Sequence, residues 1–143
     1  MKLLLVSFLF LLTPPMTWMG NFDDALKQAA ESHKQILINF SGSDWCGPCI
    51  RLRKEILETA AFGDYAGRHL VLVRADFPRQ KKNRLSAEQT RLNEALAERY
   101  NPDGKFPLTV LTSENGKVIR TWEGFPDESP EEFVQELAKS AVK

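Results

Sequence analysis

Residues 36–49 read ILINFSGSDWCGPC, and they include the only two cysteines of this 143-residue chain. The first part, Ile36 to Phe40, is a short apolar run rich in branched side chains, which is typical of a buried β-strand. Proline lacks an N–H and has a preset φ, so Pro48 suits the first turn of a helix and no interior position. The stretch therefore predicts a strand, a short loop and a helix whose start carries Cys46 and Cys49.

The spacing of the two cysteines predicts redox chemistry. Two thiols separated by two residues can close and reopen a small disulfide ring, and so carry two electrons. The thiolate is the reactive form, and the unpaired N–H groups and partial positive charge of a helix N-terminus lower the pKa of a thiol placed there. Cys46 is therefore expected to attack a substrate sulfur. Cys49, one turn further in, is expected to be more buried and to resolve the mixed disulfide.

Three other interpretations of the cysteine pair stay open. A zinc site needs about four ligands, and only His33 and His69 remain beyond the cysteines, so no metal is expected. A purely structural disulfide is the second, although so small a ring gains little from loop closure. Two inert thiols are the third, but Trp45 before the pair and Gly47-Pro48 within it are more specific than a bare Cys-x-x-Cys pattern.

The motif from Trp45 to Cys49, directly after an apolar strand, resembles the active-site sequence of the thioredoxin superfamily. The resemblance extends over roughly residues 18–142. Residues 42–46, 50–55 and 73–78 are similar, more narrowly, to a group of exported bacterial thioredoxin-like proteins. The resemblance implies an α/β fold of the thioredoxin-like three-layer sandwich type, an enzyme that exchanges thiols and disulfides, and no bound cofactor.

The rest of the chain supplies helices and strands in a matching order. Helix starts are predicted at the N-cap residues Asn21, Ser86 and Ser129, a second strand at 69–75, and a hairpin at 107–111 and 118–122 around Asn115-Gly116. The buried helix faces are expected to hold Phe22, Leu26, Ala29 and Ala30, then Leu92, Ala95, Leu96 and Tyr100, and finally Phe133, Leu137 and Ala141. Strands joined through helices pair in parallel, and a hairpin adds antiparallel strands. This order predicts a mixed central sheet with helices on both faces.

The resemblance also implies a substrate-binding set. Thioredoxins have a cis-proline at the head of the hairpin strand, facing the dithiol, and Pro107 matches that position. Phe106-Pro107 is therefore expected to be cis and to offer a strand edge to an extended substrate; a trans-proline that begins an edge strand is the alternative. Trp45 either adds an aromatic contact surface beside the sulfur or packs on the fold. Gly47 and Pro48 complete the set.

Two features depart from the family pattern. The family usually has a buried acid in the strand before the motif, as proton acceptor for the resolving thiol, and the matching position here is Asn39, with one extra residue before Cys46. An amide cannot act as a general base, so water or another group takes the proton, or exchange is slower near neutral pH. The spacing from Gly104 to Pro107 is also one residue longer than usual, which affects the shape of the partner groove.

Charged residues near the motif give weaker signals. Asp44 lies two residues before the first cysteine and would oppose thiolate formation, whereas Arg51, Arg53 and Lys54 would favour it. All four are expected to be solvated. Four cations between residues 79 and 84 form a second cluster, which is expected to be a solvated loop, with docking of an acidic partner as the alternative.

The N-terminus differs in kind from the remainder. Lys2 followed by the apolar run Leu3 to Leu12 matches the charge and the apolar core, about 7 to 15 residues long, of a secretory signal, whereas a spanning helix needs about 20 residues. Residues 1–20 are expected to be a signal peptide or an uncleaved anchor, and 21–143 one thioredoxin-like domain. Nineteen acidic and nineteen basic residues cancel, so no nucleic-acid partner is expected.

These features together predict an exported thiol–disulfide oxidoreductase, periplasmic or secreted. Gly-Pro between the cysteines resembles reducing thioredoxins, whose potential is about −270 mV, more than strong oxidants at about −120 mV. A monomeric reductase of protein disulfides is therefore favoured over an oxidant or isomerase. Outside the cytosol it needs a membrane thiol as electron donor. The alternative is a thioredoxin-fold binding or chaperone-like module that keeps the disulfide as a fixed staple.

Overall fold

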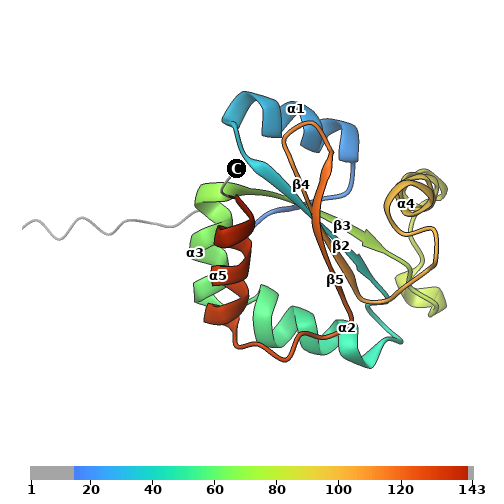
Figure 1. The fold of residues 1–143 in the computed structure, drawn as a ribbon. Helices are drawn as coiled ribbons and strands as arrows, with labels where there is room; N and C mark the ends of the chain where they lie inside the picture. Colours follow the sequence, from blue (N-terminus) through green and yellow to red (C-terminus); the bar gives the residue numbers. More distant parts are fainter. Residues whose placement is uncertain (1–14, 142–143) are drawn as a thin grey trace, which may run out of the picture.

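A five-stranded mixed sheet forms the centre of the molecule in the computed structural model, which describes residues 15–141 (Figure 1). The strands are β1 (Trp18–Met19), β2 (Gln35–Ser41), β3 (Leu70–Asp76), β4 (Leu108–Thr112) and β5 (Val118–Glu123). Their order across the sheet is β1-β3-β2-β4-β5. Strands β1 and β2 run parallel to β3, whereas β4 is antiparallel to both β2 and β5. The predicted mixed sheet with a terminal hairpin is confirmed.

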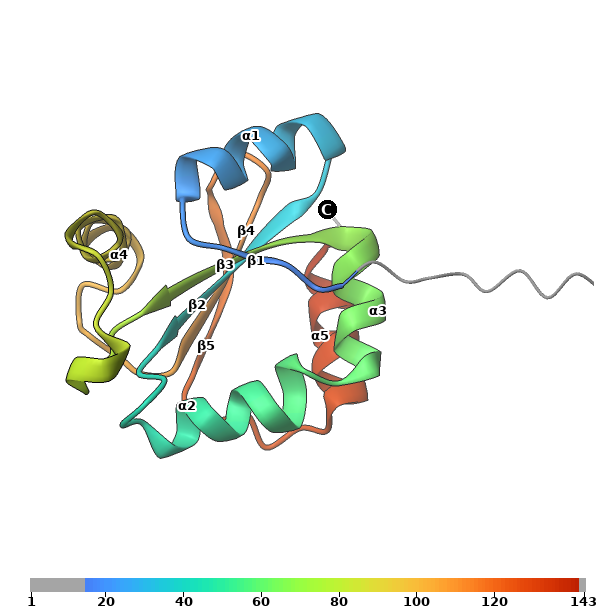
Figure 2. The same ribbon diagram turned by 180° about the vertical axis from the view of Figure 1, so that it is seen from behind.

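Helices cover both faces of the sheet, as Figures 1 and 2 show from opposite sides. The longer helices are α1 (Phe22–Ser32), α2 (Gly47–Leu52), α3 (Ala60–His69), α4 (Ala87–Tyr100) and α5 (Pro130–Ala141). One apolar core lies between the sheet and α1 with α4, and a second lies between the sheet and α2, α3 and α5. The three-layer α/β sandwich is confirmed.

Strand β2 contributes to both cores, because successive side chains of a strand point to opposite faces. Ile36, Ile38 and Phe40 belong to the core under α1 and α4. Leu37 belongs to the opposite core, and Asn39, two residues further on, shares that face. A strand buried on both faces reads as a continuous apolar run, so β2 could be recognised in the sequence. The amide of Asn39 lies on the face that α2 covers.

Side-chain caps begin the helices where the sequence predicts them. The Asn21 side chain accepts the N–H groups of Asp23 and Asp24 at the start of α1. Ser129 and Glu132 bond to each other's backbone N–H at the start of α5, at 3.3 and 2.8 Å, which is a complete capping box. Each cap satisfies N–H groups that have no partner inside the helix.

The helical segment after the dithiol differs from the prediction. Its last turn, Arg53–Leu57, is a π-helix that continues α2, and the Glu58 N–H bonds to the Arg53 carbonyl at 2.8 Å. Helix α3 then follows, capped by Thr59, and takes in His69, which the sequence pattern assigns to β3. On other helices Ala30, Ala95 and Ala141 are exposed, whereas the expected faces bury them. Small alanines fit either environment, so periodicity alone placed them incorrectly.

The sheet includes two residues of the segment expected to be a signal or anchor, 1–20. Trp18 and Met19 pair with Leu72 and Val73 of β3. The Trp18 ring stacks on Phe62 of α3, with 6.4 Å between the ring centroids. The fold therefore reaches at least to Trp18, whereas the apolar run lies outside the described residues. Among residues 15–141, no helix is long and apolar enough to cross a membrane.

Candidate active site

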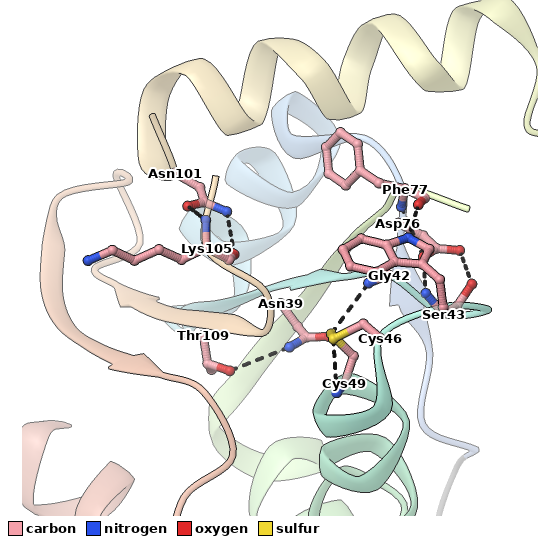
Figure 3. Close-up of a disulfide and its surroundings, with 11 residues drawn as sticks. Asn39, Gly42, Ser43, Cys46, Cys49, Asp76, Phe77, Asn101, Lys105 and Thr109 are labelled. Carbon is pink, nitrogen blue, oxygen red and sulfur yellow. Dashed lines mark hydrogen bonds between the residues drawn. A yellow bond between two sulfur atoms is a disulfide. The ribbon is translucent and has the colours of Figure 1, made fainter. Parts of the chain in front are cut away.

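The two cysteines form a disulfide where β2 leads into α2 (Figure 3). Their Cα atoms are 5.2 Å apart, and Cys46 is the N-cap of α2. Cys49 is the more buried residue, as expected, but only by a small margin, since 3% of its surface is exposed against 5% for Cys46. The Cys46 sulfur is therefore less exposed than the sequence suggests. Gly47 and Pro48, between the cysteines, are exposed.

Each sulfur accepts a backbone hydrogen bond. The Cys49 N–H donates to the Cys46 sulfur at 3.3 Å, and the Gly42 N–H donates to the Cys49 sulfur at 3.5 Å. The donor to Cys46 belongs to the first turn of α2, where helix N–H groups have no partner of their own. The same donor stabilises negative charge on this sulfur when the disulfide opens. The site can therefore hold a thiolate at Cys46.

Asn39 lies on the same face of the sheet as the dithiol and is 3% exposed. Its Nδ2 atom donates to the Thr109 hydroxyl of β4 at 3.4 Å, and Figure 3 shows the amide directed toward the cysteines. The position expected to hold a proton-accepting acid is thus occupied by a buried, neutral, hydrogen-bonded group. Among the described residues no cluster of histidine, cysteine and acidic side chains suits a metal ion.

Arg74 is the neighbour of Asn39 on β3 and was not singled out from the sequence. Its guanidinium lies 4.1 Å from the Trp18 ring centroid. Burial lowers the pKa of Arg74 below its ordinary value, and the nearby charge of Arg53 lowers it further. Within residues 15–141 its Nη2 atom is buried without a hydrogen-bond partner. The sequence offered one signal for this residue, because Arg74 is a cation within the otherwise apolar run of β3.

Pro107 follows a cis peptide bond at the head of β4, as the resemblance implies. Its carbonyl accepts the Gly124 N–H at 2.9 Å. Asn101 holds the preceding loop through two hydrogen bonds to the Lys105 backbone, both at 2.8 Å. Gly104 supplies the bend with a φ of 63°, where a side chain is strained. The extra residue between Gly104 and Pro107 therefore follows a loop that the hydrogen bonds between Asn101 and Lys105 close.

Trp45, Phe77 and Phe106 form an aromatic cluster beside the disulfide. The Phe106 ring meets Trp45 and Phe77 edge-on, with centroid distances of 5.6 and 5.4 Å. The Trp45 indole N–H donates to the Phe77 carbonyl at 2.7 Å. Its ring also covers Gly42 so closely that an added Cβ there would lie 2.3 Å from a ring atom. Of the two expectations for Trp45, packing on the fold is therefore the one that the geometry shows.

Asp44 is not simply solvated, as the sequence suggests. Its carboxylate accepts the backbone N–H groups of Arg79 and Gln80 at 2.9 and 3.0 Å, and Nδ2 of Asn83 at 3.0 Å. These donors, the Arg79 N–H first, lower the pKa of Asp44 below its ordinary value. Asp76 makes a similar link, accepting the Ser43 N–H at 2.9 Å. Asp44 therefore ties the active-site loop, residues 42–45, to the segment after β3, and Asp76 ties the same loop to the end of β3.

The cations of the active-site helix differ in their surroundings. Arg51 pairs with Glu55 at 3.0 Å, and its guanidinium lies 4.1 Å from the Phe125 ring centroid. Arg53 pairs with Glu58 at 3.7 Å. Lys54 is exposed, as expected. Because the two arginines are neutralised locally, they add little to the field at the sulfurs.

A Cys-x-x-Cys disulfide at a helix start, after the central strand of a three-layer sandwich, defines the thioredoxin-like class of thiol–disulfide oxidoreductases. The profile of the thioredoxin-like domain family matches residues 22–141. The chain belongs to this family, and it is an enzyme of that class.

Two Chlamydia pneumoniae proteins are similar to the chain over most of its length. The disulfide bond reductase DsbH of Chlamydia pneumoniae is 36% identical over 123 residues, covering 86% of this chain and 71% of that protein. The thioredoxin-related protein DsbJ of the same organism is 30% identical over 115 residues, covering 80% of this chain but 32% of its own length.

Solved structures show the same fold. The DsbH oxidoreductase structure has a TM-score of 0.79 and 31% identity, covering 87% of this chain and 83% of that one. A thioredoxin from Thermus thermophilus has a TM-score of 0.67 at 18% identity, covering 90% of this chain and 88% of its own. At that identity the second likeness concerns the fold alone.

Proposed function

We propose that this protein is an exported reductase of protein disulfides that acts through Cys46 and Cys49. The observation that carries the proposal is the N–H of Cys49, which donates to the Cys46 sulfur at the start of α2. A thiolate is the attacking species in exchange, and this donor favours the thiolate at Cys46 over that at Cys49.

The exchange transfers two electrons in two displacements. The Cys46 thiolate attacks one sulfur of a substrate disulfide, forms a mixed disulfide and releases the other substrate sulfur as a thiolate. Cys49 then loses its proton and attacks the Cys46 sulfur, so that the second substrate thiolate leaves and the Cys46–Cys49 disulfide forms. The substrate is reduced, and a donor dithiol reduces the enzyme for the next cycle. Asn39 takes no proton, so water or another group accepts the one that Cys49 loses.

The direction, location and partners follow from the sequence and from the relatives. Gly-Pro between the cysteines is typical of reducing thioredoxins, and the relative that is 36% identical over 123 residues is a disulfide bond reductase. The apolar N-terminal run supports export to the periplasm or beyond, with the segment cleaved before Trp18 or kept as an anchor. We infer protein disulfides as substrates, a membrane thiol as electron donor, and a monomer as the working form. Gly47, Pro48 and the Phe106-Pro107 edge form the substrate-binding surface beside Cys46.

Reduction of insulin by the full chain, with dithiothreitol as the electron source, tests the proposal. The wild type should accelerate precipitation of the insulin B chain, and Cys46→Ser should remove the acceleration. Lys54→Ala is a matched control on the exposed side of the active-site helix and should behave as the wild type. Absence of turnover in the wild type would instead support a binding module with a fixed disulfide.

A further inference from the structure

Exposed positive charge is concentrated in the segment that follows β3. We define residues 77–84 as the basic loop. Its exposed cations are Arg79, Lys81, Lys82 and Arg84. None of them makes an ion pair within the described part of the chain, whereas Arg51 and Arg53 of the active-site helix each pair with a glutamate. The basic loop therefore presents charge that the rest of the described fold does not neutralise.

Asp44 fixes this loop against the active-site loop without using its cationic side chains. The carboxylate is occupied by the backbone N–H groups of Arg79 and Gln80 and by the side-chain amide of Asn83. In addition, the Gln80 side chain donates to the Asp44 carbonyl at 3.2 Å. The backbone of the loop is therefore held in place, while the charged ends of its lysines and arginines remain exposed to solvent.

Arg79 brings positive charge to Trp45, the residue that precedes the dithiol. Its guanidinium carbon lies 3.7 Å from the centroid of the Trp45 ring. Trp45 precedes Cys46 and is itself held by the bond from its indole N–H to Phe77. A cation stacked on this ring is attracted by the ring face and is fixed in direction. The charge of Arg79 therefore lies on the ring of the residue that precedes Cys46.

A groove continues the basic loop toward α4. It has a volume of about 530 Å³, and its lining includes the apolar side chains Phe77, Pro78 and Leu85. Its charged lining residues are of both signs: Arg84, the acids Asp76 and Glu94, and Arg91, which pairs with Glu88 at 2.7 Å. The groove can therefore hold an apolar side chain of a peptide, while the attraction for carboxylates comes from the exposed cations of the basic loop.

We propose that the basic loop is a docking surface for an acidic segment of the partner protein. The inference rests on the proposed exchange at Cys46 and adds the chemistry of its partner, in which carboxylate side chains lie beside the cysteine to be reduced. Complementary charge steers the encounter and raises the association rate, and salt screens the effect.

Two disulfide peptides of equal length, one with glutamates and one with lysines beside the cysteines, test this surface. With the reduced full chain at low ionic strength, we expect kcat/KM for the acidic peptide to exceed that for the basic one by about tenfold. The ratio should approach one at high ionic strength, where charges are screened. Neutral hydroxyethyl disulfide should be reduced at a rate that depends little on salt.

Reversing the charge of selected lysines tests whether the preference for the acidic peptide comes from the basic loop. Lys81→Glu combined with Lys82→Glu should remove or invert the preference for the acidic peptide. Lys27→Glu combined with Lys117→Glu makes the same change in net charge on α1 and in the β4–β5 turn, at the opposite end of the sheet (Figure 1). That control should keep most of the preference. Equal kcat/KM values for the two peptides in the wild type, or a preference that survives reversal at 81 and 82, would overturn the docking surface.

A binding measurement distinguishes failure of the proposed docking surface from failure of the proposed disulfide exchange. If the wild type does not reduce even hydroxyethyl disulfide, the proposed function fails. The docking surface is then judged by titration of the oxidised chain with a cysteine-free acidic peptide. Tryptophan fluorescence should change in the wild type and much less in the Lys81→Glu, Lys82→Glu variant. No change in the wild type, or capture by phosphatidylglycerol vesicles in place of the peptide, contradicts an acidic protein partner.

Discussion

At the scale of single residues, the two sulfurs differ in the amide that each one accepts. Cys46 receives an N–H from the first turn of α2, and Cys49 receives one from Gly42 in the preceding loop. Only the first donor adds the partial positive charge of a helix start. The proposed roles of attacking and resolving thiol thus rest on where the chain changes from loop to helix, since the two cysteines are almost equally buried.

Trapping experiments test this assignment. In an oxidising extract, Cys49→Ser should accumulate mixed disulfides, because the partner stays on Cys46 when no resolving thiol is present. Cys46→Ser should accumulate few. Non-reducing electrophoresis of the two variants, each beside the double variant as background, measures the difference. Comparable trapping by both single variants would show that the roles are not separated.

Asn39 places a side chain that does not ionise under the dithiol. Replacement by aspartate would place a carboxyl group in a position that is 3% exposed. Burial disfavours the charged form and raises its pKa, and the neighbouring Arg74 offsets part of this cost.

We therefore predict that Asn39→Asp is less stable than the wild type and that the deficit grows with pH. When the folded pKa lies above the unfolded one, the unfolded state releases its proton first, so stability falls as pH rises through about 4 and above. A deficit of about 2 kcal/mol at pH 7, smaller at pH 4, is expected for a pKa raised by one to two units. Urea titrations at both pH values measure it, and Asn39→Leu, which has no proton to lose, should show a deficit independent of pH.

At the scale of elements, local patterns identified most of the fold. Strand β2, the caps of α1 and α5 and the Asn115-Gly116 hairpin each depend on residues adjacent in sequence, which periodicity and capping rules describe. Helix α3 was missed although Thr59 caps it and its buried side chains Phe62, Tyr65 and Ala66 are spaced by three and four residues. The π-helical turn at 53–57 has no comparable local signal.

The surroundings of the dithiol were predictable only in part, for a physical reason. The cysteines, Asn39 and Pro107 occupy positions set by a motif or by the head of a strand. The links from Asp44 to the basic loop join residues 35 to 39 positions apart. Such contacts depend on how β2 and β3 align in the sheet, and neither composition nor spacing reports that alignment.

Asp44→Asn should loosen the basic loop, because a neutral amide is a weaker acceptor for three donors than a carboxylate. Hydrogen exchange at the Arg79 and Gln80 amides should become faster in the variant at neutral pH. The folded pKa of Asp44 is lowered, so the wild-type link is fully present above the ordinary aspartate value of about 3.9 and is lost as pH falls through the lower folded value. Asp64→Asn, on α3, is the matched control; if it accelerates exchange equally, Asp44 does not hold the loop.

At the scale of the whole molecule, β1 connects the N-terminal segment to the sheet. Trp18 contacts α3 through Phe62 and β3 through Arg74. We predict that a chain beginning at Pro15 is more stable than one beginning at Gly20 by about 2 kcal/mol, the scale expected for burial of one large side chain. Urea unfolding of the two chains measures the difference, and Trp18→Ala in the longer chain reports the share of that side chain. Identical midpoints would show that β1 does not stabilise the fold.

The reduction potential of the Cys46–Cys49 pair tests the proposed reductase most directly, because it sets the direction of electron flow. The full chain is equilibrated with glutathione and dithiothreitol buffers, and the fraction of reduced protein is read from alkylation and mass. We predict a value near the reducing thioredoxins, about −270 mV. A value near about −120 mV, typical of strong oxidants, would contradict a reductase and make the protein a donor of disulfides.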